Sequence, residues 1–100
     1  MTRYRVLAWD GIPAQVKVYE EGRRAVSAEL PAWFVEHIDR EAMRRGLYGT
    51  DAYLDQWAWS GYEERDGTAE EVVAAVVAEL EAEWAEARRR WAAGADDVSR

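Results

Sequence analysis

Hydrophobic and polar positions alternate in short runs near the start of this chain and recur at helical spacing further on. An aromatic and aliphatic run at residues 4–9 and an alternating run at residues 14–19 each predict a β-strand. Asp10 and Gly11 between them form a turn signal, so we expect an antiparallel hairpin. Residues 23–30 fit either a short third strand or the lead-in to a helix.

Two helices are expected in the middle of the chain. The first covers residues 31–45, because Pro31 suits the opening position of a helix and apolar residues then recur every four positions. Gly46 provides the left-handed residue that commonly ends a helix. A shorter helix is expected at residues 51–60, followed by a polar loop at residues 62–67.

The longest periodic segment, residues 69–93, predicts a third helix. Thr68 and Glu71 have the spacing of a capping box at its start. The apolar face is wide in the first half and narrows to Trp84 and Trp91 in the second. We therefore expect the first half to pack on the sheet and the second half to project.

Together these elements predict a small α+β fold, in which an antiparallel sheet of two or three strands packs against three helices. One hundred residues suit one domain of modest core. The expected division is a single domain at residues 1–94, where Gly94 ends the third helix, and a flexible C-terminal tail at residues 95–100.

Composition favours a binding module over a self-contained enzyme. The chain has six tryptophans but no cysteine and one histidine, and cysteine and histidine carry much of nucleophilic, acid–base and metal chemistry. Without cysteine, neither a disulfide framework nor a cysteine-ligated zinc site can form. No apolar run approaches a membrane span and no signal peptide is evident, so a cytoplasmic location without membrane contact is expected.

Charge is unevenly divided between the halves of the chain. Residues 1–50 have eight basic and seven acidic side chains, whereas residues 51–100 have five and thirteen. The acidic half repels a nucleic acid backbone or an anionic membrane. Nucleic acid is therefore an unlikely partner, and the basic half could instead meet an acidic protein or the acidic half of a second copy.

Candidate chemistry is sparse. His37, with Glu41 one turn on, could hold a metal only with a further strong ligand, so a helix-surface role is the simpler interpretation. Asp10 could act as a base at a strand end, or support the turn before Gly11. We expect no catalytic residue, metal or cofactor in this chain.

The candidate binding surface combines basic, turn and aromatic residues. Arg23 and Arg24, with Lys17 and one of the N-terminal arginines, could form a basic face on the hairpin, while the arginines at 40, 44 and 45 form a second cluster. The candidate binding residues are Trp9, Asp10, Ile12, Pro13, Gln15, Arg23, Arg24 and Trp59. Trp84 and Trp91 are candidate interface residues, since exposed tryptophans make good anchors.

Several segments resemble a known family. They are Trp9–Val16, Gly22–Ala25, Ala42–Leu47 and Thr50–Leu54. They are similar to short bacterial proteins labelled "virulence factor", a domain also found in a larger conserved staphylococcal virulence factor with helical repeats. The resemblance implies no catalytic residues. It implies an accessory role, because members often lie beside genes of corrinoid and tetrahydrofolate one-carbon metabolism.

The leading hypothesis is a non-catalytic interaction module or accessory subunit that binds a protein partner or itself. A second is a small-molecule or anion-binding domain, in which Arg23 and Arg24 grip a phosphate or carboxylate and Asp10 supplies a base. A third is nucleic-acid binding through the basic half.

Overall fold

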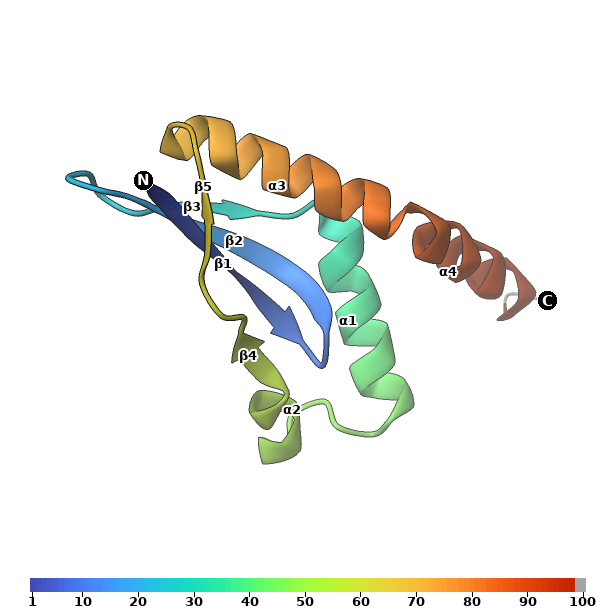
Figure 1. The fold of residues 1–100 in the computed structure, drawn as a ribbon. Helices are drawn as coiled ribbons and strands as arrows, with labels where there is room; N and C mark the ends of the chain where they lie inside the picture. The colour runs from blue at the N-terminus through green and yellow to red at the C-terminus, as the bar shows by residue number, and fades with distance from the viewer. Residues whose placement is uncertain (99–100) are drawn as a thin grey trace.

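A computed structural model describes the backbone of residues 1–98 and the side chains of residues 1–92. Within them the chain is an α+β protein with one five-stranded antiparallel sheet and four helices (Figure 1). The strands are β1 Thr2–Trp9, β2 Ile12–Glu20, β3 Val26–Glu29, β4 Trp57–Trp59 and β5 Glu63–Arg65. The helices are α1 Ala32–Arg44, α2 Asp51–Asp55, α3 Ala69–Glu83 and α4 Ala85–Val98. The α+β class is confirmed, and residues 23–30 contain a third strand.

The sheet has the order β3-β2-β1-β4, and β5 also pairs with β1. Two short strands therefore share one edge of β1. β4 pairs with the Leu7–Trp9 end and β5 with the Thr2–Tyr4 end. Between these two ladders the chain runs as a loop, so this edge of the sheet is interrupted at its middle (Figure 1).

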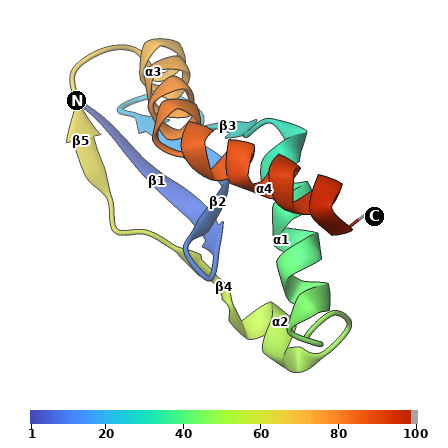
Figure 2. The same cartoon turned by 90° about the vertical axis from the view of Figure 1, so that its right-hand side faces the viewer.

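Helices cover one face of the sheet. Successive side chains along each strand point to opposite faces of the sheet. On the covered face, Tyr4, Val16 and Val18 are buried against α1 and α3. Figure 2, turned by 90° from Figure 1, shows both helices on the same side of the strands. In the part of the chain that is described, no helix crosses the other face, which remains open.

The β1–β2 hairpin has the expected tight turn. Asp10 and Gly11 both have positive φ angles, 46° and 87°, as a two-residue turn of the type that matches strand twist requires. The register then shifts, because Leu7 lies opposite Gln15 but Ala8 lies opposite Pro13. This bulge gives Pro13, which has no N–H, a place in a strand that is paired on both sides.

The prediction of one helix over residues 51–60 is wrong in its second half. α2 ends at Asp55, and the next residues form β4, where Trp57 lies opposite Trp9 of β1. The predicted polar loop at residues 62–67 likewise contains β5. In both cases pairing with β1, which is distant in sequence, decides the local conformation.

The third predicted helix is two helices. α3 ends at Glu83, and Trp84 has a φ of −98° and a ψ of 4° at the junction with α4. The residues buried deepest on α3 are Ala69, Val72 and Val76. α4 continues beyond Gly94, where an end was expected, to Val98. The remainder of the expected tail, residues 99–100, lies outside the described residues.

The capping box is confirmed. The Thr68 hydroxyl accepts a hydrogen bond from the Glu71 N–H at 3.1 Å, and the Glu71 carboxylate accepts one from the Thr68 N–H at 3.0 Å. We expect Thr68→Ala to lower the free energy of unfolding by about 1 kcal/mol, because it removes the cap from the helix that covers the sheet. Urea denaturation followed by circular dichroism measures this. Thr68→Ser, which retains the hydroxyl, is expected to lose less than half as much.

None of the described helices has both the length and the apolar character needed to cross a membrane.

Candidate functional site

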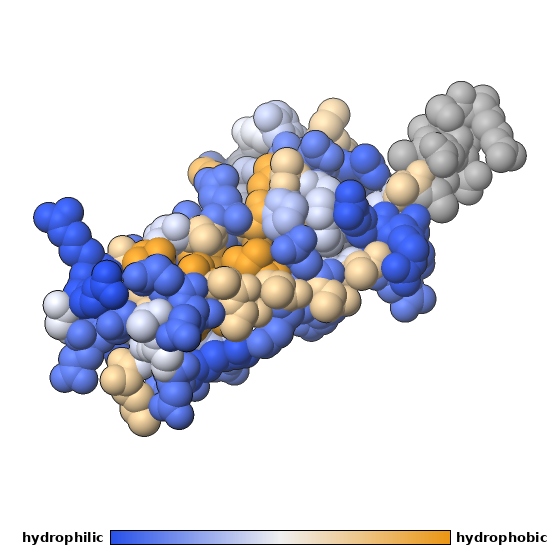
Figure 3. Space-filling model, turned by 90° about the horizontal axis from the view of Figure 1, so that it is seen from above, coloured by the Kyte–Doolittle hydropathy of each residue, from blue (hydrophilic) through white to orange (hydrophobic). Residues whose placement is uncertain are grey.

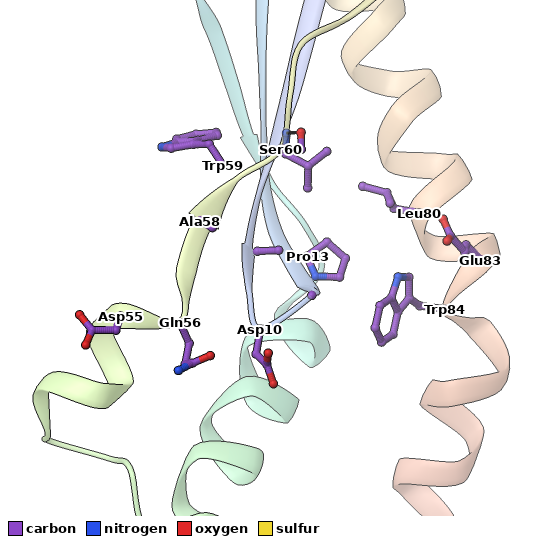
Figure 4. Close-up of a pocket in the computed structure, with 13 residues that line it drawn as sticks. Asp10, Pro13, Asp55, Gln56, Ala58, Trp59, Ser60, Leu80, Glu83 and Trp84 are labelled. Carbon is purple, nitrogen blue, oxygen red and sulfur yellow. Dashed lines mark hydrogen bonds between the residues drawn. The ribbon is translucent and has the colours of Figure 1, made fainter.

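A groove lies between the β1–β2 turn, β4 and the end of α3 (Figure 4). Its volume is about 580 Å³. The groove is lined by Val6, Ala8, Asp10, Gly11, Pro13, Asp55, Gln56, Ala58, Trp59, Ser60, Leu80, Glu83 and Trp84. These residues come from three regions distant in sequence, which the pairing of β4 with β1 and the packing of α3 on the sheet bring together.

The walls of the groove are apolar for simple geometric reasons. Side chains four residues apart lie on one face of a helix, and Leu80 and Trp84 both point from the helix toward Pro13 of the hairpin (Figure 4). Val6 and Ala8 are two residues apart on β1 and share the covered face of the sheet. The groove is thus an incompletely filled continuation of the core between the sheet and α3.

A second hollow of about 410 Å³ extends the groove along α3. It shares Val6, Ser60, Leu80 and Glu83 with the first. Its other lining residues are Tyr4, Gly61, Tyr62, Glu63, Val76 and Glu79. Figure 3 looks down on the side that α3 forms, where apolar side chains gather between hydrophilic ones. The two hollows together offer an elongated site rather than a deep, enclosed one.

Charge in the groove has one sign. Five carboxylates line the two hollows, and neither hollow has a lysine or arginine in its lining. Asp10 is paired with Arg45 at 2.6 Å, and Glu79 accepts a hydrogen bond from Arg65 at 2.6 Å. Among the described side chains, Glu83 has no basic group within ion-pair distance. Its charge remains available to a ligand.

Ser60, a hydroxyl within the groove, has a structural role. Its side chain accepts a hydrogen bond from the Val6 N–H at 2.9 Å, and its own N–H donates to the Val6 carbonyl at 2.8 Å. These contacts satisfy the backbone of β1 at the gap between β4 and β5. The hydroxyl also donates to the Gly61 carbonyl at 3.0 Å. No histidine lines the groove to activate this hydroxyl as a nucleophile.

Four candidate residues from the sequence line the groove: Asp10, Pro13, Trp59 and Trp84. The ring of Trp59 points to the other side of β4, away from Leu80 and Trp84 (Figure 4). The groove therefore has one aromatic side chain facing inward, that of Trp84.

Two further candidates belong to the core. Trp9 is fully buried, and its indole N–H donates to the Tyr53 carbonyl at 2.9 Å. Ile12 is 7% exposed. The structure gives these two residues packing roles, and neither side chain is accessible to a ligand.

Gln15, Arg23 and Arg24 lie apart from the groove. Gln15 belongs to the open face of the sheet, opposite Leu7 and Glu29 in the two ladders. Arg23 follows the other end of β2 from Asp10, and its guanidinium lies 3.4 Å from carboxylate oxygens of Glu20 and Glu70. Strand β2 separates these arginines from Asp10, so an anion grip and a general base do not come together in one site.

The basic cluster expected at residues 40–45 is largely neutralised. Glu41 accepts hydrogen bonds from Arg44 and, at 3.0 Å, from Arg45, which also binds Asp10. The hydrogen bond from Arg44, with that from Arg45, lowers the pKa of Glu41 to about 2 despite the opposing effect of burial. Asp10 thus links the hairpin turn to the end of α1 and has a structural partner.

Trp91 packs on α1 within the same chain. Its ring stacks on His37 with ring centres 3.3 Å apart and lies 5.8 Å from the ring of Trp33.

Burial lowers the pKa of His37, whose Nδ1 is buried without a hydrogen-bond partner in the described structure. No three metal-ligating side chains gather anywhere among the described residues. The use of Trp84 and Trp91 as an interface remains a prediction.

The sequence alone does not indicate that Ala58, Leu80 and Glu83 line a groove. The four-residue step from Leu80 to Trp84 was visible in the apolar seam of the third predicted helix. What lies opposite that seam depends on β4, which has only three residues and is too short to predict from alternation.

Comparison with known proteins gives a family match. A family model described as "Virulence factor" matches residues 7–90, in agreement with the resemblance of the sequence segments. Neither the curated proteins nor the solved structures contain a significant match to the chain.

Proposed function

The chain belongs to the virulence factor family, and from this premise we propose that it is a non-catalytic interaction module whose groove receives an apolar, positively charged segment of a partner protein. The observation that carries the proposal is an elongated apolar groove bordered only by carboxylates among its charged lining residues. A family name of this kind specifies no reaction, so the groove itself defines the expected ligand.

Apolar contact would provide most of the affinity. Trp84 and Leu80 present contiguous apolar surface, and a partner side chain placed between them and Pro13 would remove that surface from water. Aromatic residues that line such hollows are typical energetic centres of protein interfaces. The open, elongated shape favours a peptide segment over a compact metabolite.

Charge would provide selectivity. A lysine or arginine of the partner can approach Glu83, which has no basic partner among the described side chains. An acidic segment would meet like charge along the whole groove, which disfavours its binding. The preferred ligand is therefore an amphipathic segment with basic residues beside its apolar ones.

A charge reversal on α3 tests this function. The probe is a fluorescein-labelled amphipathic peptide of lysine and leucine, measured by fluorescence anisotropy. We expect Glu83→Lys to weaken its binding about tenfold, through loss of one charge contact and addition of a repulsion. Glu81→Lys is the matched control, because Glu81 lies on the same helix outside the groove and the net charge changes equally. Equal losses in both variants would show non-specific attraction and contradict the proposal.

A steric variant provides a second test. Ala58 lies on β4 at the mouth of the groove and is exposed. Ala58→Trp would fill the space opposite Leu80 with a residue that favours β-strands. We expect loss of peptide binding with an unchanged circular dichroism spectrum; retained binding would exclude the groove as the site.

The cellular role that we propose is that of an accessory subunit in the cytoplasm, in one-carbon metabolism. Its support is the sequence resemblance alone. Co-purification of the tagged chain with a corrinoid- or tetrahydrofolate-dependent enzyme, lost in Ala58→Trp, would support it. If Ala58→Trp co-purifies with the enzyme as well as the wild type does, the cellular role does not depend on the groove.

A further inference from the structure

The open face of the sheet carries a cluster of cations and aromatic rings that borders the groove only through Trp59 and the second hollow only through Tyr62. Arg5 is at its centre. The Arg5 guanidinium carbon lies 4.3 Å from the centre of the Trp59 ring, 5.0 Å from that of Tyr62 and 5.7 Å from that of Tyr19. Arg3 lies over Tyr62 at 4.8 Å, and the Lys17 ammonium lies 5.7 Å from the Tyr19 ring.

Strand register builds this cluster. Arg5 lies opposite Lys17 and Arg3 lies opposite Tyr19 in the β1–β2 ladder, so all four side chains share one face. β4 adds Trp59, which lies opposite Leu7. The basic–aromatic face, defined as Arg3, Arg5, Lys17, Tyr19, Trp59 and Tyr62, thus combines positions from three separate segments.

The cations of this face lack the partners that neutralise other arginines. Arg23, Arg44, Arg45 and Arg65 are all ion-paired. Among the described residues, no carboxylate lies within ion-pair distance of Arg3, Arg5 or Lys17. Aromatic rings, and not carboxylates, lie next to these three cations.

The positive charge of the basic–aromatic face lowers the pKa of one of its own tyrosines, Tyr19. Burial raises the pKa of Tyr19, but hydrogen bonds from Arg5 at 3.1 and 3.3 Å and the charges of Arg5 and Lys17 outweigh it and lower that pKa overall. The face is also accessible, since Trp59 is 37% and Tyr62 is 50% exposed.

We infer that the basic–aromatic face is a second binding surface, which takes a short acidic segment of a partner protein. Carboxylates would pair with Arg3, Arg5 and Lys17, whose guanidinium and ammonium donors have no anionic partner in the described structure. Apolar side chains of the segment would pack on Trp59 and Tyr62. This chemistry is the opposite of that proposed for the groove, so the two surfaces would select different partners.

A protein segment suits this face better than a nucleic acid. Glu29 and Glu64 lie at its margins, in register with Gln15 and Arg3, and the whole chain has a net charge of −7. A long polyanion would extend beyond three cations and meet those carboxylates. The ring faces are also occupied by Arg3 and Arg5, which leaves less room for base stacking.

The test measures binding of a fluorescein-labelled peptide of alternating glutamate and leucine by fluorescence anisotropy. A peptide with glutamine in place of glutamate is the neutral reference, and single-stranded oligothymidylate of matched length is the nucleic-acid probe. We expect the acidic peptide to bind the wild-type chain about tenfold more tightly than the neutral one.

The variant Arg5→Gln/Lys17→Gln is expected to weaken acidic-peptide binding at least about tenfold. Arg89→Gln/Arg90→Gln, with the same charge change at exposed positions on α4, is expected to leave binding nearly unchanged. Because Arg5 packs on three rings, the milder Arg3→Gln is measured as well; it should weaken binding in the same direction without disturbing the fold.

Nuclear magnetic resonance locates the site. In ¹⁵N-labelled protein, the acidic peptide should shift the indole N–H resonance of Trp59, assigned by its absence in Trp59→Phe, and leave that of Trp84 unmoved. Equal losses in both charge variants, a shift confined to Trp84, or no binding would overturn the inference. Tighter, steeply salt-dependent binding of oligothymidylate would overturn it in favour of a nucleic-acid surface. Because the probe and variants differ from those for the groove, either proposal can fail alone.

Discussion

Trp9→Ala is expected to lower the free energy of unfolding by about 3–5 kcal/mol, the largest loss for any single change considered. Trp9 is fully buried at the end of β1, lies against the tilted ring of Tyr53 with ring centres 5.7 Å apart, and donates to the Tyr53 carbonyl. The Arg45 guanidinium lies 5.4 Å from its ring. Alanine would leave a cavity where β1, α2 and the end of α1 meet, and the Tyr53 carbonyl would keep only the longer hydrogen bond from the Gln56 N–H, at 3.3 Å.

Urea denaturation followed by far-ultraviolet circular dichroism measures this loss without relying on tryptophan emission. Trp59→Ala is the matched control, because it removes the same atoms from an exposed position two residues from the β4 partner of Trp9. Its expected cost is about 1 kcal/mol or less. Comparable costs in the two variants would mean that Trp9 does not hold α2 against the sheet.

Glu41→Gln is expected to cost about 1–2 kcal/mol at neutral pH. Converting the whole pKa shift into a free energy of unfolding would give a larger value. Arg44 and Arg45 are 68% and 36% exposed, however, so solvent screens their attraction to Glu41. The Glu41 pKa is depressed in the folded state, so its stabilising contribution is complete above its ordinary pKa of 4.5 and is lost as pH falls toward 2.

Unfolding curves across this pH range should therefore converge for wild type and Glu41→Gln as the medium becomes acidic. Glu36→Gln, on the same helix and exposed, is the control and should follow the wild type closely. A constant difference between wild type and Glu41→Gln at all pH values would contradict the role of ionised Glu41.

Elements with local signals could be predicted from the sequence. The hairpin has alternation on both sides of Asp10 and Gly11, and α3 begins at the capping box of Thr68 and Glu71. These signals operate within a few residues, so they do not depend on the rest of the fold. The Gly46 signal was equally local, and this residue has a φ of 70° after the last turn of α1.

Elements that depend on distant partners could not be predicted. β5 consists of Glu63, Glu64 and Arg65, a composition with poor strand propensity, and it is a strand because it pairs with β1. The end of α3 at Trp84 has no proline or glycine to indicate it. At this junction the ring of Trp84 makes an edge contact with Phe34 of α1, with ring centres 6.2 Å apart. The end of α3 therefore coincides with a packing contact on α1.

The same limit applies to the candidate sites. The sequence indicated a basic face with Lys17 and one of the two N-terminal arginines, but it grouped them with Arg23 and Arg24, and the structure pairs Arg23 with Glu20 and Glu70. Likewise Trp59 could be named as a candidate binding residue, whereas its position beside Arg5 required the register between β1 and β4.

The two proposed surfaces lie on opposite sides of a single sheet. An apolar groove with carboxylates would bind a basic segment beside α3, and the basic–aromatic face would bind an acidic one behind it. Trp59 and Tyr62 border both surfaces, but neither surface includes the side chain that the other uses most, Trp84 or Arg5, so a module of this kind could bind two partners at once.

The alternation along β1 also constrains how such a protein can change during evolution. Tyr4, Val6 and Ala8 serve the groove and the core, whereas Arg3 and Arg5 serve the other surface. Inserting or deleting one residue in β1 would exchange the two sets and bury guanidinium groups in the core. Substitutions could therefore alter either surface gradually, but the length of this strand is fixed by both surfaces together.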